Sequence, residues 1–169
     1  MVSKMRLLFA VLFCVMAVPN AFAEKLPAPT GKPVLTISGL IGNTNVGDTA
    51  VFDRDMLEKL GMETIVTTTP WYSGKVRFDG VSLKKLMDLV GAKGETAKVI
   101  ALNDYTTTVP LEDFRKFPTI LALKMNGEYM QIRDKGPLFI VYPYDSSPEL
   151  QNQIYYSRSS WQVSKIIIE

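Results

Sequence analysis

Short β-branched runs, divided by glycine, proline and polar turn residues, leave this chain few choices other than a sheet-based fold. Such runs cover residues 34–41, 63–69, 76–78, 98–102, 106–109, 138–142 and 161–168. The strongest local signal is Asn126-Gly127, which lies between the apolar segments 120–125 and 128–132. This dipeptide is typical of a tight turn between two antiparallel strands. The sequence therefore predicts a β-rich fold.

Helices are predicted over three short segments, residues 54–60, 83–90 and 111–116. Asp53 and Ser82 can cap the first two, because their side chains accept hydrogen bonds from free N–H groups of a first turn. Leu86 and Val90 belong to one apolar face of the second helix, which Gly91 is expected to end. Short strands and short helices in a chain of 169 residues indicate a single strand-rich α+β domain.

Proline and glycine also predict the boundaries of the domain and its turns. Residues 24–33 contain three prolines and a glycine and predict an extended, poorly ordered leader before a domain at 34–169. Residues 70–74, Pro-Trp-Tyr-Ser-Gly, predict a loop, and Asp79-Gly80 predicts a turn.

The N-terminus has the composition of a cleaved export signal. Lys4 and Arg6 precede an apolar run over residues 7–18, which is too short for a helix that spans a bilayer. Residues 21–23 have the Ala-x-Ala pattern of a cleavage site. Residues 1–23 are therefore predicted to be a signal peptide and the mature protein to be periplasmic, the alternative being a buried N-terminal helix.

The residue types that remain after cleavage exclude several kinds of chemistry. Cys14, within the apolar run, is the only cysteine, and the chain has no histidine. Cysteine proteases, Ser-His-Asp hydrolases, His/Cys zinc sites, His-ligated haem and disulfide frameworks each need one of these groups. Without Lys4 and Arg6 the 19 basic residues fall to 17, equal to the 17 acidic ones. Electrostatics therefore do not favour nucleic acid or an anionic membrane as a partner.

A resemblance to a known family is carried by an ordered set of segments. They are Phe-Asp-Gly-Val-Ser-Leu-Lys-Lys-Leu at 78–86, Ala-Leu-Asn-Asp-Tyr at 101–105 with Val-Pro-Leu-Glu-Asp at 109–113, and a third segment from Leu-Ala-Leu-Lys-Met-Asn-Gly at 121–127 through Arg-Asp-Lys-Gly-Pro-Leu at 133–138 to Tyr-Pro at 142–143. In this order and spacing they resemble the oxidoreductase molybdopterin-binding domain, which has the sulfite-oxidase-like fold. The resemblance covers roughly residues 34–168.

The resemblance also implies a missing metal ligand. In the family, a cysteine thiolate ligates molybdenum at the end of the strand before the Gly-Val helix. Here that strand ends in Thr67, Thr68 and Thr69, so one of these threonines replaces the cysteine. A hydroxyl is a poor substitute for a soft, easily ionised sulfur. The chain therefore resembles most the cysteine-less periplasmic members, which implies that it binds a pterin, without metal or catalysis, and is linked to membrane-bound enzymes of cyclic-di-GMP.

Two groups of residues are candidates for contact with a flat heterocycle. Trp71 and Tyr72, in the predicted loop, can stack on such a ring. Asn103, Asp104 and Tyr105 follow a strand, where an amide or carboxylate can pair with the donor–acceptor edge of a pterin. The simpler interpretations are that the aromatic rings pack over the core and that the polar residues only form a turn.

The resemblance adds further candidates, and Thr68 and Thr69 complete the predicted ligand-binding set. Arg133 and Lys135 precede a Gly-Pro pair that lies beside the pterin in the family, and they can provide a cation for its tail. Arg158 and Trp161 resemble the last family segment, in which an arginine approaches the cofactor. The simpler interpretations are a solvated hairpin end for the first pair and an ion pair with a carboxylate for Arg158.

Three classes of function follow from these observations. The favoured one is a periplasmic, non-catalytic pterin-binding protein that signals to a membrane-bound cyclic-di-GMP enzyme or another sensor partner. The second is a molybdopterin-dependent oxidoreductase that lacks the usual cysteine ligand. The third is a hydrolase with paired carboxylates such as Asp104 and Asp145, which the spacing does not favour. Resemblance of fold alone does not establish any of them.

Overall fold

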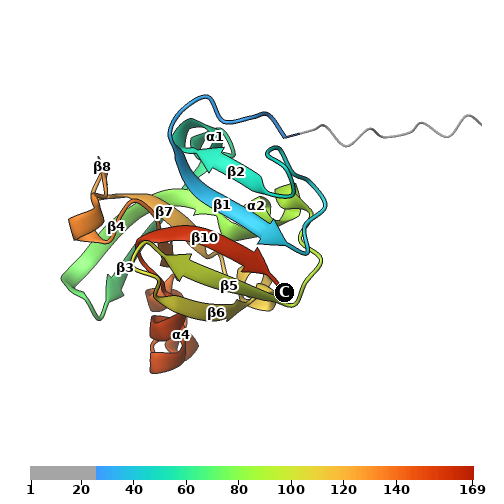
Figure 1. The fold of residues 1–169 in the computed structure, drawn as a ribbon. Coiled ribbons are helices and arrows are strands. Elements are labelled where there is room, and N and C mark those ends of the chain that lie inside the picture. The colour runs from blue at the N-terminus through green and yellow to red at the C-terminus, as the bar shows by residue number, and fades with distance from the viewer. Residues whose placement is uncertain (1–25) are drawn as a thin grey trace, which may run out of the picture.

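The computed structural model describes residues 26–169, and its strands form two sheets (Figure 1). Sheet 1 has the order β2-β1-β10-β5-β6. Its strands are β1 (Pro33–Gly39), β2 (Ala50–Asp53), β5 (Thr96–Ala101), β6 (Thr106–Pro110) and β10 (Val163–Ile168). Strands β1 and β10 run parallel, and the other pairs of this sheet are antiparallel. The first and last strands of the described chain therefore lie side by side.

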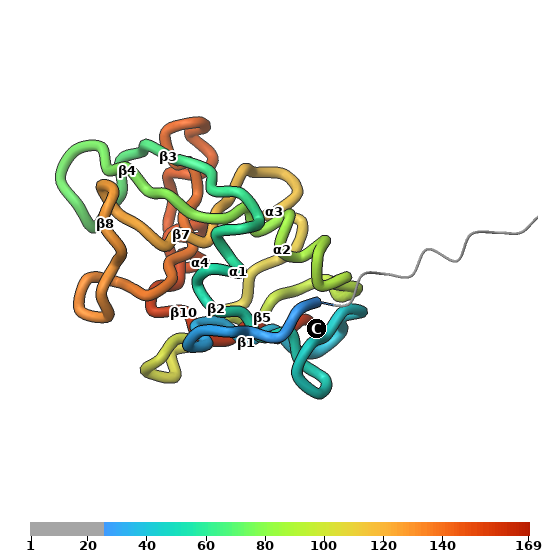
Figure 2. The backbone as a smooth tube through the Cα atoms, turned by 90° about the horizontal axis from the view of Figure 1, so that it is seen from above, coloured from blue at the N-terminus to red at the C-terminus, as the bar shows by residue number. Residues whose placement is uncertain are grey.

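Sheet 2 has the order β3-β4-β7-β8, with β9 also paired to β7. Its strands are β3 (Met62–Thr69), β4 (Tyr72–Ser82), β7 (Ile120–Met125), β8 (Glu128–Tyr129) and β9 (Phe139–Val141). All of its pairs are antiparallel. Figure 2 shows β3, β4 and β7 in one layer and β1, β2, β5 and β10 in another.

The helices are short and lie around the sheets. They are α1 (Arg54–Glu58), α2 (Leu83–Val90), α3 (Leu111–Lys116), α4 (Gln153–Arg158) and the 3-10 turns η1 (Ile132–Asp134), η2 (Tyr144–Ser146) and η3 (Pro148–Leu150). Asp53 caps α1 by accepting a hydrogen bond from Met56 N, and Ser82 accepts one from Lys85 N at the start of α2. Gly91 ends α2 with φ 61°, a conformation that glycine adopts at little cost. Among residues 26–169, no helix is both long and apolar enough to cross a bilayer.

The buried hydrophobic residues form one continuous core. This core contains a cluster of aromatic rings close to the turns that carry the candidate site. Its largest fully buried side chains include Phe52, Phe78, Phe114, Phe139, Tyr142 and Tyr144. Phe139 contacts Phe78 edge to face at 5.8 Å between ring centres. Trp71, which follows β3, packs on Phe139 of β9, so the aromatic cluster helps to fix the orientation of its side chain.

The predicted strand-rich α+β domain is confirmed, as are its three helices and most of its strands. The predicted turn at Asp79-Gly80 is wrong, because both residues lie inside β4. Gly80 does not form a turn but allows β4 and β7 to pack closely, since an added Cβ would collide with the backbone of Leu121. The predicted loop 70–74 is shorter than expected, because β4 begins at Tyr72. The sequence analysis did not predict β2 or α4.

Residues 26–32, within the predicted leader, contain no helix or strand but are attached to the domain. Asp53 Oδ2 accepts hydrogen bonds from Thr30 N and Gly31 N at 2.8 and 2.7 Å. Leu26 is buried against the core. The predicted signal peptide, residues 1–23, lies outside the described residues.

Candidate functional site

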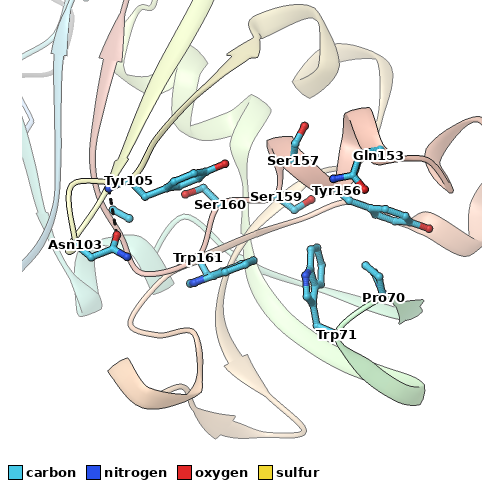
Figure 3. A pocket seen from close by; sticks show the side chains of 11 residues that line it. Pro70, Trp71, Asn103, Tyr105, Gln153, Tyr156, Ser157, Ser159, Ser160 and Trp161 are labelled. Carbon is cyan, nitrogen blue, oxygen red and sulfur yellow. Dashed lines mark hydrogen bonds between the residues drawn. The ribbon is translucent and has the colours of Figure 1, made fainter.

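A cavity of about 380 Å³ opens where three separate segments meet. It is lined by Pro70 and Trp71 from the β3–β4 turn, by Ala101 at the end of β5 with Asn103 and Tyr105 from the turn that follows, and by Gln153, Tyr156, Ser157, Ser159, Ser160 and Trp161 from α4 and the residues after it. Figure 3 shows the aromatic rings of Trp71, Tyr105, Tyr156 and Trp161 around this space. The volume lies within the range of ordinary small-molecule sites.

Trp71 forms one wall of the cavity and is held there on several sides. Thr69 Oγ1 accepts hydrogen bonds from Trp71 N and Tyr72 N at 3.3 and 3.2 Å, which stabilises the tight β3–β4 turn. The indole packs edge to face on four rings, with centre distances of 5.5 Å to Phe139, 6.2 Å to Tyr144, 6.1 Å to Tyr156 and 5.8 Å to Trp161. Trp71 therefore packs over the core, which was the simpler interpretation of the sequence, and it also lines the cavity.

Trp161 forms a second wall and is more open, with 37% of its surface exposed. Lys135 Nζ lies 3.8 Å from the centre of the Trp161 ring, 5.5 Å from that of Trp71 and 5.9 Å from that of Tyr72. The main-chain oxygen of Lys135 also accepts a hydrogen bond from Gln162 N at 3.0 Å. These cation–π contacts and the backbone bond restrict the orientation of Trp161.

Burial lowers the pKa of Lys135 below its ordinary value of 10.5. Among the described residues, no carboxylate forms an ion pair with its ammonium group. The unfolded chain holds this proton more strongly than the folded chain. Burial of the charged group therefore lowers the free energy of unfolding by its full amount at pH values below the lowered pKa. This loss of stability disappears as the pH rises towards 10.5.

We expect the tryptophan fluorescence to report this deprotonation, because both tryptophans of the chain contact Lys135. The emission should change with a midpoint below 10.5 in an alkaline titration. Lys135→Met should remove this transition, whereas Lys98→Met on β5 should keep it. Identical titrations of the two variants would show that the signal arises elsewhere, for example from tyrosine ionisation.

The polar groups at the cavity are uncharged. Asn103 Oδ1 accepts a hydrogen bond from Tyr105 N at 3.2 Å, and the Tyr105 ring is 53% exposed. Ser160 is 2% exposed, and its hydroxyl has no hydrogen-bond partner within residues 26–169. A buried hydroxyl without a partner carries a free-energy cost that a ligand can remove. None of the lining side chains is charged.

The Arg158 side chain contacts a buried network and does not line the cavity. Arg158 Nη1 donates to Asp113 Oδ2 at 2.9 Å, and Tyr142 OH donates to the same oxygen at 2.8 Å. Burial and the negative charge of Asp113 raise the pKa of Tyr142. The ion pair considered as the simpler role of Arg158 is therefore the arrangement observed.

Arg133 and Asp104 also lie outside the lining of the cavity. Arg133 is exposed and contacts Asp134, with Nε and Oδ2 3.4 Å apart. Asp104 is exposed in the β5–β6 turn, where its φ of 62° marks a left-handed conformation. Conversely, the sequence analysis did not select Gln153 and Tyr156, which line the cavity. Asn152, which caps α4 by accepting from Ile154 N, was the available signal for this helix.

The threonines at the end of β3 are engaged with η2. Thr67 is buried, and its Oγ1 accepts a hydrogen bond from Asp145 N at 3.0 Å. The Asp145 carboxylate accepts hydrogen bonds from both the N–H and the hydroxyl of Thr68. These bonds lower the pKa of Asp145 and keep it ionised. Thr68 and Thr69 therefore stabilise local structure and do not line the cavity.

A protein-held molybdenum centre does not fit this set of side chains. Residues 26–169 contain no cysteine or histidine, and they include no group of three or more potential metal-ligating side chains. The hydroxyls of Thr67 and Thr68 have other partners, as described above. A phosphate-bearing cofactor tail would find no cation among the lining side chains, and the Lys135 ammonium group beside the Trp161 wall is already engaged with aromatic rings. An uncharged planar ring fits the aromatic walls and the free hydroxyl of Ser160 much better.

Comparison with known proteins finds a family whose model matches the chain and a solved structure with a similar fold. The model of the family described as "Oxidoreductase molybdopterin binding domain" matches residues 53–145. The crystal structure of the sulfane dehydrogenase SoxCD from Paracoccus pantotrophus is similar, with a TM-score of 0.56 and 18% sequence identity. The match covers 79% of this chain but 37% of that one, so this chain spans little more than a third of its length. No curated protein matches the sequence.

Proposed function

The chain belongs to the oxidoreductase molybdopterin-binding domain family, and from this premise we propose that it binds a pterin without using molybdenum. The observation that carries the proposal is the cavity that Trp71 and Trp161 both line. It combines aromatic walls, an unpaired buried hydroxyl at Ser160 and a lining without charge. These features suit an uncharged, flat heterocycle with polar edges.

Binding would use stacking and edge hydrogen bonds. Trp161 and Tyr105 are partly exposed and provide aromatic surface, whereas Trp71 is fixed by its neighbours. Asn103 is exposed and provides an amide group, and Ser160 provides a hydroxyl group that is buried and reaches a ligand only if its side chain turns. Both groups can donate and accept. A pterin ring has alternating donors and acceptors along its edge, so these two side chains suit its recognition.

The alternative, a molybdopterin-dependent oxidoreductase, has less support from the residues of the site. The fold family is consistent with it, but the chemistry of the donors is not. A thiolate stabilises molybdenum through soft, easily ionised sulfur, and the described residues contain no thiol. No observation in the structure favours catalysis over binding.

The proposal includes a signalling role, which rests on the resemblance and on the N-terminal sequence. We propose a periplasmic protein whose partner is the periplasmic part of a membrane-bound enzyme of cyclic-di-GMP or of another membrane sensor. The ligand would influence such a partner only to the extent that it binds two states of the domain with different affinity.

The first test is to identify the molecule that the protein carries. Protein purified from the cells that produce it would be denatured, and the released compounds analysed by fluorescence and mass spectrometry, together with molybdenum analysis. We expect a pterin without stoichiometric molybdenum. Stoichiometric molybdenum together with molybdopterin would contradict the proposal and support the oxidoreductase.

A direct titration tests for binding of a ligand that is lost during purification. Both tryptophans of the chain line the cavity, so added neopterin should quench nearly all of the tryptophan emission. The same titration with neopterin monophosphate should give weaker binding, because no lining side chain offers a cation to the phosphate and Lys135 is engaged with the aromatic rings. Absence of quenching by either compound would contradict pterin binding at this cavity.

A further inference from the structure

Strand β3 forms an open edge of sheet 2. The sheet order begins with β3, which pairs with β4 on one side and with no other strand of the described residues. Figure 2 shows β3 on the outside of its layer. Its last part is covered by η2, because Asp145 accepts a hydrogen bond from Thr68 N at 3.0 Å. The uncovered part therefore runs from Met62 to Val66.

The register identifies the backbone groups that face outward. Val66 lies opposite Arg77 of β4, and the N–H and C=O of Arg77 are both bonded to Asn126 on the far side. Val66 and Arg77 are therefore a non-hydrogen-bonded pair, so that the N–H and C=O of Val66 point away from β4. The alternation of a strand places the same groups of Thr64 and Met62 in the same direction.

A groove of about 400 Å³ runs beside this edge. Residues 63–67 of β3 form one wall, and Pro118, Pro143, Asp145 and Ser146 form the other. The charged side chains among the lining residues are both carboxylates, those of Glu63 and Asp145.

The lysine partners of these carboxylates lie outside the groove. Lys85 contacts Glu63 at 2.7 Å and Lys75 contacts Asp145 at 3.7 Å, but their side chains are 55% and 66% exposed. Exposed pairs of this kind contribute only about 0–1 kcal/mol, so a bound cation can replace the lysines. The groove therefore has a charge that favours basic side chains.

The edge lacks three of the usual protections against pairing with another chain. Natural sheets protect their edges with proline, lysine or a bulge. Residues 62–68 contain neither proline nor lysine, and the register with β4 shifts only after Thr68. On the solvent face of β3, Met62 is 37% and Val66 55% exposed. An unprotected edge in a native protein is a suitable site for a partner strand.

We propose that the β3 edge binds an extended peptide segment with basic side chains, which adds to sheet 2 as a further strand. The backbone groups of Met62, Thr64 and Val66 would pair with the segment, and Glu63 and Asp145 would bind its cationic side chains. The second wall lies directly beside the edge, so a single extended segment, which is narrower than the sheet edge of a second copy, fits better. This surface is distinct from the pterin cavity.

The test uses a labelled peptide of defined sequence. Fluorescein-labelled Thr-Lys-Val-Lys-Val-Lys-Thr would be titrated with the full protein, and the same peptide with glutamate in place of lysine serves as the charge control. Val66→Pro removes one outward N–H without breaking a bond of the folded sheet, and proline is tolerated at an edge. We expect it to weaken binding of the lysine peptide about 5- to 10-fold. Val66→Thr keeps the N–H and should bind like the wild type.

Amide hydrogen exchange on the wild-type protein provides a second measurement that does not depend on a variant. The lysine peptide should slow exchange at Thr64 and Val66 and leave the amides near Trp161 unchanged. Equal binding of the glutamate peptide, or no protection at Thr64 and Val66, would overturn the proposal. Self-association of the free protein that Val66→Pro abolishes would also overturn it and would assign the edge to a second copy.

Discussion

Replacing Trp161 with alanine is expected to lower the affinity for neopterin about 10- to 100-fold. Stacking of a heterocyclic base on an aromatic side chain is worth about 1–3 kcal/mol when it is removed by alanine substitution. Trp161 is 37% exposed, so its ring is available to a ligand and its loss leaves most of the core intact. Isothermal titration calorimetry measures the change directly, and circular dichroism checks that the variant is folded.

The matched control is Tyr129→Ala, which removes another partly exposed ring at a site far from the lining. Tyr129 lies on β8 and is 40% exposed. Trp71→Ala is a less suitable test, because that ring also packs on Phe139, Tyr144 and Tyr156 and its loss would destabilise the domain. Affinities that are equal for Trp161→Ala and Tyr129→Ala would place the ligand elsewhere.

Replacing Asp113 with alanine is expected to lower the free energy of unfolding by about 3 kcal/mol. The carboxylate is 9% exposed and accepts hydrogen bonds from both Arg158 and Tyr142. Its removal leaves a largely buried guanidinium and a fully buried phenol without their partner, and both groups are costly to desolvate. Urea unfolding followed by circular dichroism measures the change.

Asp88→Ala is the control for this prediction, because its ion pair with Lys84 is exposed and should contribute less than about 1 kcal/mol. Tyr142→Phe should be milder than Asp113→Ala, since it leaves the Arg158–Asp113 pair in place. A loss of stability for Asp113→Ala no larger than that for Asp88→Ala would show that the buried network contributes little. It would also free Arg158 for another role.

Local chemistry explains which elements the sequence predicts well. Ser82 and Gly91 bound α2 because capping and a left-handed glycine depend on neighbours within one turn. Asn126-Gly127 forms the β7–β8 turn for the same reason. Asp79-Gly80 has the same local turn propensity but lies inside β4, since contact with Leu121 on β7 outweighs it. Turn residues therefore predict well only where no distant strand competes.

The candidate site shows the same limit in another form. Trp71, Asn103, Tyr105 and Trp161 were candidates from the sequence, and the fold brings them to one cavity. Arg158 was equally plausible, but a buried carboxylate 45 positions earlier in the chain attracts its side chain. No local pattern encodes that choice, because an ion pair depends on which elements pack together.

The amino-acid sequence alone determined the strand-rich class of the fold and the shortage of thiol and imidazole donors, since strand propensity and residue chemistry are local properties. It also carried the family resemblance, because ordered motifs survive in the chain itself. Only the tertiary structure decided that the cavity is aromatic and uncharged, that Arg158 pairs with Asp113, and that β3 has an open edge. Each of these depends on contacts between residues that are far apart in the chain, where packing and desolvation select one partner among many.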